Sequence, residues 1–419
     1  MARQLKLCTV KQCPVKGRLD FTKNQVGCCP PRWHRLFAME NAMTTLSTPT
    51  VGAVAVAELC AAAQTHREHG ERHGTLHPEV WRELAESPLP RAALPTEFGG
   101  LEWSAPQLLE AVRKVSAADP AAGWVAAIHG PAGAFLSRLD PSAAQDFADR
   151  RLVVGGSSMP VGTAVRHGGR VRLQGRWPLV TGAPAMTLAA LAAPTTGPDG
   201  VTVTRWWLVP SSVVSIENDW DALGLRGSAS YTLGCDTEVP LAHGIDLTGP
   251  PAVDAPMFRY PLYALLAGCI AEVARATADR ALAAFTELAV GIRTRYGAGP
   301  LAEQPIAQAA YARAHGQVRA AVALLDSATT AAWISAQAGP VPTEQVALLR
   351  SACCQMVDTA ERACRELFDA AGSAAIHRRN GLEGCWRDAV VISRHALVAA
   401  RGRQLVGAHH LTSRVAKDL

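Results

Sequence analysis

The sequence lacks several features that would place it in a familiar class of protein. No run of about 18 apolar residues occurs, so no membrane-spanning helix is expected. The formal net charge is only +5 over 419 residues, and the basic residues are spread along the chain, which argues against a nucleic-acid-binding surface. No histidine and cysteine cluster has the spacing of a zinc site, so no metal is expected. No Gly-x-Gly-x-x-Gly follows a predicted strand, which argues against an NAD(P)H site.

The residues that are present indicate a globular, largely helical protein. Hydrophobic residues make up 48% of the chain and aromatic residues 5%, and alanine dominates the apolar share, which favours closely packed helices. The length allows two or three domains and a large core. The eleven cysteines are an odd number, and five of them lie isolated among apolar neighbours, as reduced, buried thiols do: Cys60, Cys235, Cys269, Cys364 and Cys385. We therefore expect a soluble, cytoplasmic protein.

Residues 1–38 differ from the rest of the chain. They contain four cysteines and six Lys or Arg by residue 23, without a sustained hydrophobic period. A mitochondrial-type leader and a small cysteine-rich metal module are alternatives, but the cysteine spacing fits no standard site. We expect a disordered extension upstream of the true start, with Met39 or Met43 as candidate initiators.

The hydrophobic period divides the remainder into three predicted domains. Residues 39–150 have helical patterns, and at Leu152 the period becomes strand-like, which gives a mostly antiparallel β domain over 151–250. Gly-rich turn signals separate four strand candidates, Val171–Trp177, Met186–Leu191, Val201–Val209 and Tyr231–Val239. Residues 251–419 are helical again. Four long helices are expected there, and such helices form a bundle: Tyr263–Val290, Ile306–Ala336, Thr343–Ala371 and Cys385–Val406.

The last of these helices carries the residues of greatest chemical interest. No Pro or Gly occurs between Cys385 and Arg401, so the stretch is expected to be helical throughout. Asp388 and His395 are seven residues apart and would project from one face. Histidine is the side chain whose ordinary pKa allows proton donation or acceptance near neutral pH. A core histidine beside a surface Arg387–Asp388 pair is the structural alternative.

Four motifs in this order resemble the acyl-CoA dehydrogenase superfamily, and the likeness extends from about residue 50 to residue 412. They are Leu94–Gly100, Gly175–Gly182, Trp220–Ser228 and the pair Arg387–Asp388. The resemblance implies a mainly α fold with a central β domain: an N-terminal helical domain, a middle antiparallel β-barrel and a C-terminal four-helix bundle.

One position decides between branches of that family. The best-known dehydrogenases carry a glutamate base eight residues after this aspartate, where the present chain has Ala396. A methyl group cannot abstract a proton. The neighbouring His395, and the segments around Trp124 and Trp177, instead resemble the reduced-flavin monooxygenases that share the fold, similar to 4-hydroxyphenylacetate hydroxylases and dibenzothiophene monooxygenases.

The resemblance also implies roles for individual residues. His395 and Thr181 are the expected catalytic residues, and Trp124 and His129 are expected to line the substrate pocket, with a core histidine as the alternative for His129. The expected flavin-binding residues are Ser157, Ser158, Thr181, Gly182, Arg226 and Ser228. A surface salt bridge is the alternative for Arg226, and Asp388 is expected to hold the helix or the imidazole in place.

The sequence thus predicts a two-component flavin-dependent monooxygenase that uses reduced FMN or FAD and O2 to hydroxylate an aromatic or polyketide-like small molecule. The partners implied are a separate flavin reductase and further copies of the chain in a homotetramer. FMN and FAD both remain open, because Arg293–Gly297 only loosely resembles the family's adenine-pyrophosphate motif. An FAD-dependent acyl-CoA dehydrogenase and a non-catalytic, flavin-free relative are the alternatives.

Overall fold

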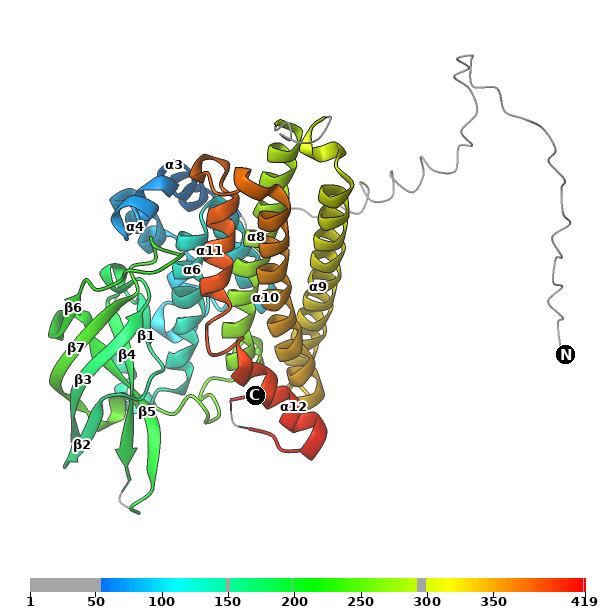
Figure 1. Cartoon of the computed structure of the whole chain (residues 1–419). Helices are drawn as coiled ribbons and strands as arrows, with labels where there is room; N and C mark the ends of the chain where they lie inside the picture. The colour runs from blue at the N-terminus through cyan, green and yellow to red at the C-terminus, as the bar shows by residue number, and fades with distance from the viewer. Residues whose placement is uncertain (1–53, 148–150, 198, 292–298, 417) are drawn as a thin grey trace, which may run out of the picture. The chain divides into compact units, whose positions relative to one another are not determined.

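The computed structural model describes residues 54–147, 151–197, 199–291, 299–416 and 418–419 (Figure 1). These residues fall within one compact unit, Pro49–Leu419. The predicted extension 1–38 and the segment Arg293–Gly297 lie outside the described residues. None of the helices described is long and apolar enough to span a membrane.

The first part of the described chain is helical, as the sequence predicts. Its helices are α3 (Ala57–His73), α4 (Pro78–Glu86), α5 (Ala105–Ala118) and α6 (Pro120–Ala132). Ser104 and Gln107 form a reciprocal capping box at the start of α5, and Asp119 caps α6. Helix α6 is buried on nearly every side and packs against α5 and α8, as expected of a helix that is apolar all round.

The strands form one mixed sheet within the described residues. They are β1 (Val154–Ser157), β2 (Thr163–His167), β3 (Arg170–Val180), β4 (Leu188–Thr196), β5 (Thr202–Pro210), β6 (Val214–Glu217), β7 (Tyr231–Pro240) and β8 (Gly244–Ile245). The order is β6-β7-β3-β2-β4-β5-β8, with β1 on β4. Strand β4 pairs in parallel with β1 and β2 and antiparallel with β5. The hydrogen-bonded order is not closed, so the predicted antiparallel barrel is not confirmed.

The sheet shares its core with the helices through strand β4, which is buried on both faces. Leu188, Ala190 and Ala192 belong to the helical core, whereas Ala189, Leu191 and Ala193 belong to the core of the sheet. This alternation follows from the two-residue period of a strand. It fixes the sheet against the helices that carry the candidate site.

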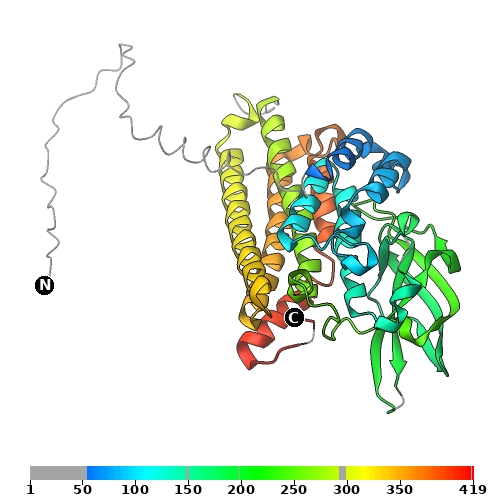
Figure 2. The same cartoon turned by 180° about the vertical axis from the view of Figure 1, so that it is seen from behind.

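The C-terminal part contains three long helices packed side by side, Leu262–Gly291, Pro305–Ala338 and Thr343–Ala371 (Figures 1 and 2). The helices are α7 (Pro256–Arg259), α8 (Leu262–Gly291), α9 (Pro305–Ala338), α10 (Thr343–Ala371), α11 (Leu382–Ile392) and α12 (Ala400–Thr412). The short α11 packs on α8 and α10. A bundle of four long helices is therefore not confirmed.

The predicted helix Cys385–Val406 is wrong in its middle. Helix α11 ends at Ile392 and α12 begins at Ala400, so Asp388 and His395 do not share one helical face. The His395 Nδ1 accepts a hydrogen bond from the Leu397 N–H at 3.3 Å, and the Val398 and Ala399 N–H groups donate to the His395 carbonyl. The N–H groups of Arg394, His395 and Val398 bond the carbonyl three residues back instead of four, which breaks the α-helix although no Pro or Gly lies between Cys385 and Arg401.

Candidate functional site

The candidate site is built around Thr181, the residue that follows β3. Trp124 and His129 of α6 both reach it. The Trp124 indole N–H donates to the Thr181 hydroxyl at 3.1 Å, and the His129 Nε2 bonds the Thr181 carbonyl at 3.0 Å. Both the side chain and the backbone of Thr181 are therefore held by one buried helix.

Three buried hydroxyl groups, those of Thr181, Ser230 and Ser228, form a chain of hydrogen bonds. Thr181 Oγ1 lies 2.9 Å from Ser230 Oγ, which lies 2.9 Å from Ser228 Oγ. The Gly182 N–H donates to the Ser228 carbonyl at 3.0 Å, so the turn after β3 and the segment before β7 are joined by backbone as well. Ser230 is the member that the sequence did not single out.

Gly182 is required by this geometry. Its φ is +66°, a conformation that disfavours residues with a Cβ. A Cβ there would lie 2.5 Å from His129 Nε2 and 2.9 Å from a Val125 methyl group. The close approach of α6 to Thr181 thus depends on a glycine at position 182.

His129 is fully buried and uncharged at neutral pH. Burial lowers its pKa to about 4. Since a carbonyl can only accept, the His129 Nε2 carries the proton that it donates to Thr181. Its Nδ1 is then a bare acceptor, and no residue in the described ranges bonds it.

His395 enters the site from the turn after α11. Its ring meets Trp124 edge-on, with 5.6 Å between the ring centroids. Burial and, to a smaller extent, the positive charge of Arg350 lower the pKa of His395 to about 4. Because Nδ1 accepts from the Leu397 N–H, the proton of the neutral ring sits on Nε2.

Arg350 of α10 is a site feature that the sequence analysis missed. Its side chain is almost fully buried, and one nitrogen donates to the Tyr263 carbonyl at 3.0 Å. Its Nε has no hydrogen-bond partner among the described residues. No local sequence signal distinguishes this arginine, because α10 carries two others, Arg362 and Arg365, that lie on the surface.

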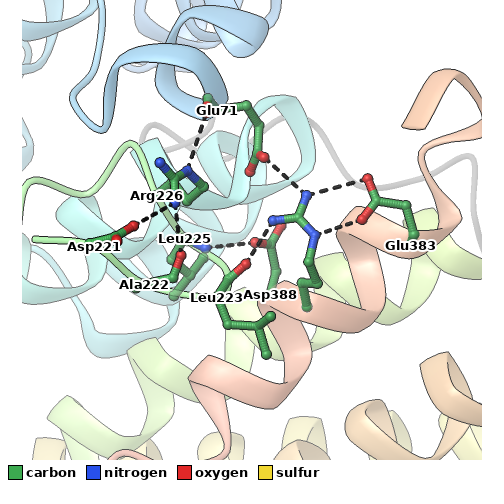
Figure 3. Close-up of polar contacts among 9 residues, drawn as sticks. Glu71, Asp221, Ala222, Leu223, Leu225, Arg226, Glu383 and Asp388 are labelled. Carbon is green, nitrogen blue, oxygen red and sulfur yellow. Dashed lines mark hydrogen bonds and ion pairs between the residues drawn. The ribbon is translucent and has the colours of Figure 1, made fainter. Parts of the chain in front are cut away.

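Asp388 and Arg387 hold the segment before β7 rather than His395. Figure 3 shows Asp388 beside Leu225 of that segment. The Leu225 N–H donates to Asp388 Oδ1 at 2.7 Å. Arg387 donates to the Leu223 carbonyl at 2.7 Å and pairs with Glu71 at 2.9 Å. Burial raises the pKa of Asp388 to about 7 although the Leu225 bond opposes this shift. The pair therefore positions the backbone that leads to Ser228 and Ser230.

Three predicted flavin-binding residues lie outside the hydroxyl cluster. Arg226 donates to Asp221 at 3.0 Å and to the Glu71 and Ala222 carbonyls, so protein acceptors engage its guanidinium. Ser157 is buried at the end of β1, where its hydroxyl accepts from the Met159 N–H, and Ser158 is exposed. The hydrogen bonds of the described residues do not connect any of the three to Thr181.

The residues at the site fit a flavin ring. A flavin presents a neutral polar edge of carbonyl oxygens and ring nitrogens beside an apolar ring system. The site offers hydroxyl groups, backbone groups and two neutral imidazoles beside the Trp124 ring, and the unpaired Nδ1 of His129 is a buried acceptor. We therefore assign Thr181, Gly182, Ser228 and Ser230 as the candidate residues for holding the cofactor.

Comparison with known proteins points to one family. Residues 50–140 match the family model "Acyl-CoA dehydrogenase, N-terminal domain", and residues 269–400 match "Acyl-CoA dehydrogenase, C-terminal domain". Similar proteins include the indole-3-acetate monooxygenase of Pseudomonas putida, 29% identical over 76% of this chain and 82% of that protein. The oxygenase component of the FADH(2)-dependent resorcinol hydroxylase of Rhizobium sp. (strain MTP-10005) is 29% identical over 85% and 92%.

A solved structure agrees with the sequence comparisons. XiaF from Streptomyces sp., in complex with FADH2 and glycerol, superposes with a TM-score of 0.79 and 25% identity, over 89% of this chain and 97% of that one. The likeness spans the helical and strand segments alike.

Proposed function

Because the chain belongs to the acyl-CoA dehydrogenase superfamily, and within it to the branch of reduced-flavin monooxygenases, we propose that it hydroxylates an aromatic or polyketide-like small molecule. It is the oxygenase component of a two-component flavin-dependent monooxygenase that uses reduced FMN or FAD and O2. The observation that carries the proposal for its site is the neutral His395 held edge-on against Trp124, which is itself bonded to Thr181.

Dehydrogenase chemistry is disfavoured by the same residues. Ala396 stands where the resemblance places the dehydrogenase base, and it lies in the turn between α11 and α12. The carboxylate of Asp388 already accepts a hydrogen bond from the Leu225 N–H. The site therefore offers hydrogen-bond donors rather than a free carboxylate base.

A bound reduced flavin supplies the electrons that activate dioxygen. Thr181 and Gly182, joined to Ser228 and Ser230 by hydrogen bonds, would hold the cofactor. The buried Trp124 ring covers one side of the His395 imidazole. Charge on the reacting oxygen is stabilised by donors that are fixed before the reaction begins.

The hydrogen bonds of His395 favour a donor role over a base role. Its Nδ1 already accepts from Leu397, and its Nε2 carries the proton. A neutral imidazole in this tautomer donates at Nε2 and has no free lone pair for a substrate proton. We infer that His395 donates a hydrogen bond from Nε2 to the reacting oxygen.

The partners and the assembly follow from the same proposal. The relative from Rhizobium sp. is named as an oxygenase component, so a separate reductase supplies the reduced flavin to this chain too. We also propose that the chain forms a homotetramer. Within one chain we propose three domains, at residues 39–150, 151–250 and 251–419. Size-exclusion chromatography with light scattering tests the assembly.

The function is tested with chemically reduced FMN or FAD, O2 and two aromatic compounds named for relatives of this chain, indole-3-acetate and resorcinol. One atom of 18O from 18O2 is expected in the product, without NAD(P)H and without a reductase. Reduction of a tightly bound FAD by an acyl-CoA, with no 18O incorporation into any aromatic compound, would overturn the proposal. The His395→Gln variant serves as the matched control for site-dependent turnover.

A further inference from the structure

A group of histidines belongs to α3 and to the start of α4, two helices that Figure 1 labels. His66, His69 and His73 follow the i, i+3, i+7 spacing of one helix flank. His77, the residue before α4, returns to the same flank. Its ring stacks on that of His66 with 3.7 Å between centroids and lies 5.0 Å from that of His69. The chain therefore concentrates imidazoles on one small surface.

Three donor atoms in this group lie close together, and one ion can bind all three once one of the two stacked imidazole rings turns, because a histidine binds a metal in the plane of its ring. His66, His77 and Glu79 each offer one ligand atom, and these atoms lie within 4.8 Å of one another. His66 Nε2 and Glu79 Oε2 are 2.9 Å apart. Two imidazoles and a carboxylate form a three-residue set that suits zinc and similar ions and leaves a further position for water or a fourth ligand.

The hydrogen bonds that these three residues already make are weak enough for metal binding to compete with them. The His66–Glu79 pair is partly exposed, and an exposed ion pair contributes little stability. The His77 Nδ1 accepts a long 3.2 Å bond from the Glu79 N–H. A divalent ion displaces the proton held between His66 and Glu79.

We propose that His66, His77 and Glu79 bind a divalent transition-metal ion, with zinc as the representative, which fastens α4 to α3. The sequence did not reveal this site because its ligands come from two helices joined by a turn, and their spacing fits no standard zinc motif. The inference is independent of the proposed monooxygenase function.

The proposed metal site adjoins the segment that carries Ser228. Between the two helices, Thr75 pairs with Ser228 in a β-bridge. A Cβ on Gly70 of α3 would lie only 3.0 Å from the Gly227 Cα. An ion that fixes α3 and α4 relative to each other therefore restricts the segment that carries the Ser228 hydroxyl.

The test is a titration of the full, untagged, chelator-treated chain with Zn2+, and with Co2+ as a spectroscopic ion. We expect one equivalent bound through imidazole and carboxylate, without the thiolate-to-cobalt band that binding to cysteines would give. Glu79→Gln and His77→Asn, in which Asn retains the cap acceptor, should each weaken the Kd at least about tenfold.

His410→Gln is the matched control. His410, His409 and Glu344 form a second histidine and carboxylate group, in which His409 is buried, and removal of the exposed His410 side chain should leave the titration unchanged. Absence of binding to the unmodified chain would overturn the proposal. So would binding that survives Glu79→Gln and His77→Asn together while circular dichroism shows that the double variant is folded.

Discussion

At the scale of single residues, the site depends on which nitrogen of each histidine carries a proton. His129 and His395 are both neutral, and each is oriented by a backbone group. His129 donates to the Thr181 carbonyl, and His395 accepts from the Leu397 N–H, so their remaining nitrogens have opposite character. One offers a lone pair and the other offers a proton.

Removal of the His395 donor should lower product formation more than flavin binding. We expect His395→Ala to reduce the rate of hydroxylation by about 10²–10³-fold, the usual effect of losing one fixed donor. Most of the consumed O2 should then appear as hydrogen peroxide. Parallel assays of product and peroxide measure the change. Unaltered coupling of O2 to product would contradict the donor role.

The charge of Arg350 should be measurable at His395. Because a nearby positive charge disfavours the imidazolium, Arg350→Met should raise the pKa of His395. The value should stay below the ordinary histidine value of about 6.5, since burial is the larger cause. An NMR titration of the imidazole resonances reports it. A pKa that falls, or that does not move, would show that the two residues do not interact.

At the scale of elements, the residues of the candidate site lie largely in turns between helices and strands, and the sequence predicts only some of these turns. The motif Gly175–Gly182 singled out Gly182 by resemblance alone, and the structure gives this glycine a backbone reason, a φ of +66° in the turn after β3. Ser230 was not predicted, since its role depends on Thr181, 49 residues away. The turn that holds His395 was not predicted, because a hydrogen bond from the Leu397 N–H to the His395 side chain stabilises it and the local sequence contains no Pro or Gly.

The turn after β3 gives a stability prediction. Gly182→Ala should cost more than about 2 kcal/mol, because backbone strain of about 1–2 kcal/mol is joined by a clash with His129. Gly168→Ala is the control: its φ is also positive, at +57°, but a Cβ there meets nothing within 4 Å. Urea unfolding compares the two. Equal losses would show that α6 does not approach Gly182 as described.

The contact between α11 and the segment before β7 gives a pH prediction. The folded-state pKa of Asp388 is raised to about 7, above its ordinary value, so its stabilising contribution is present at low pH and is lost as pH rises through 7. Asp388→Asn keeps an acceptor for the Leu225 N–H. The stability of this variant relative to the unmodified chain should therefore rise between pH 4 and pH 8. A constant difference across that range would contradict the raised pKa.

At the scale of the whole molecule, the order of helices, strands and helices was predictable because hydrophobic period and turn signals are local. The mixed pairing of β4 was not, since parallel neighbours are decided by tertiary packing on both of its faces. Arg350 and the histidine group at α3 and α4 became visible only once distant segments were placed together. Chemistry that arises from one short motif was thus easier to predict than chemistry assembled from several.

The central claim is that this chain accepts a reduced flavin and controls its reaction with O2 through His395. The most direct measurement is rapid mixing of the protein, loaded with reduced FMN or FAD, with oxygenated buffer while flavin absorbance is followed. Oxidised flavin should reappear only after a lag, and the lag should be shorter in His395→Ala. Reappearance at the rate of free flavin in the unmodified protein would contradict the account.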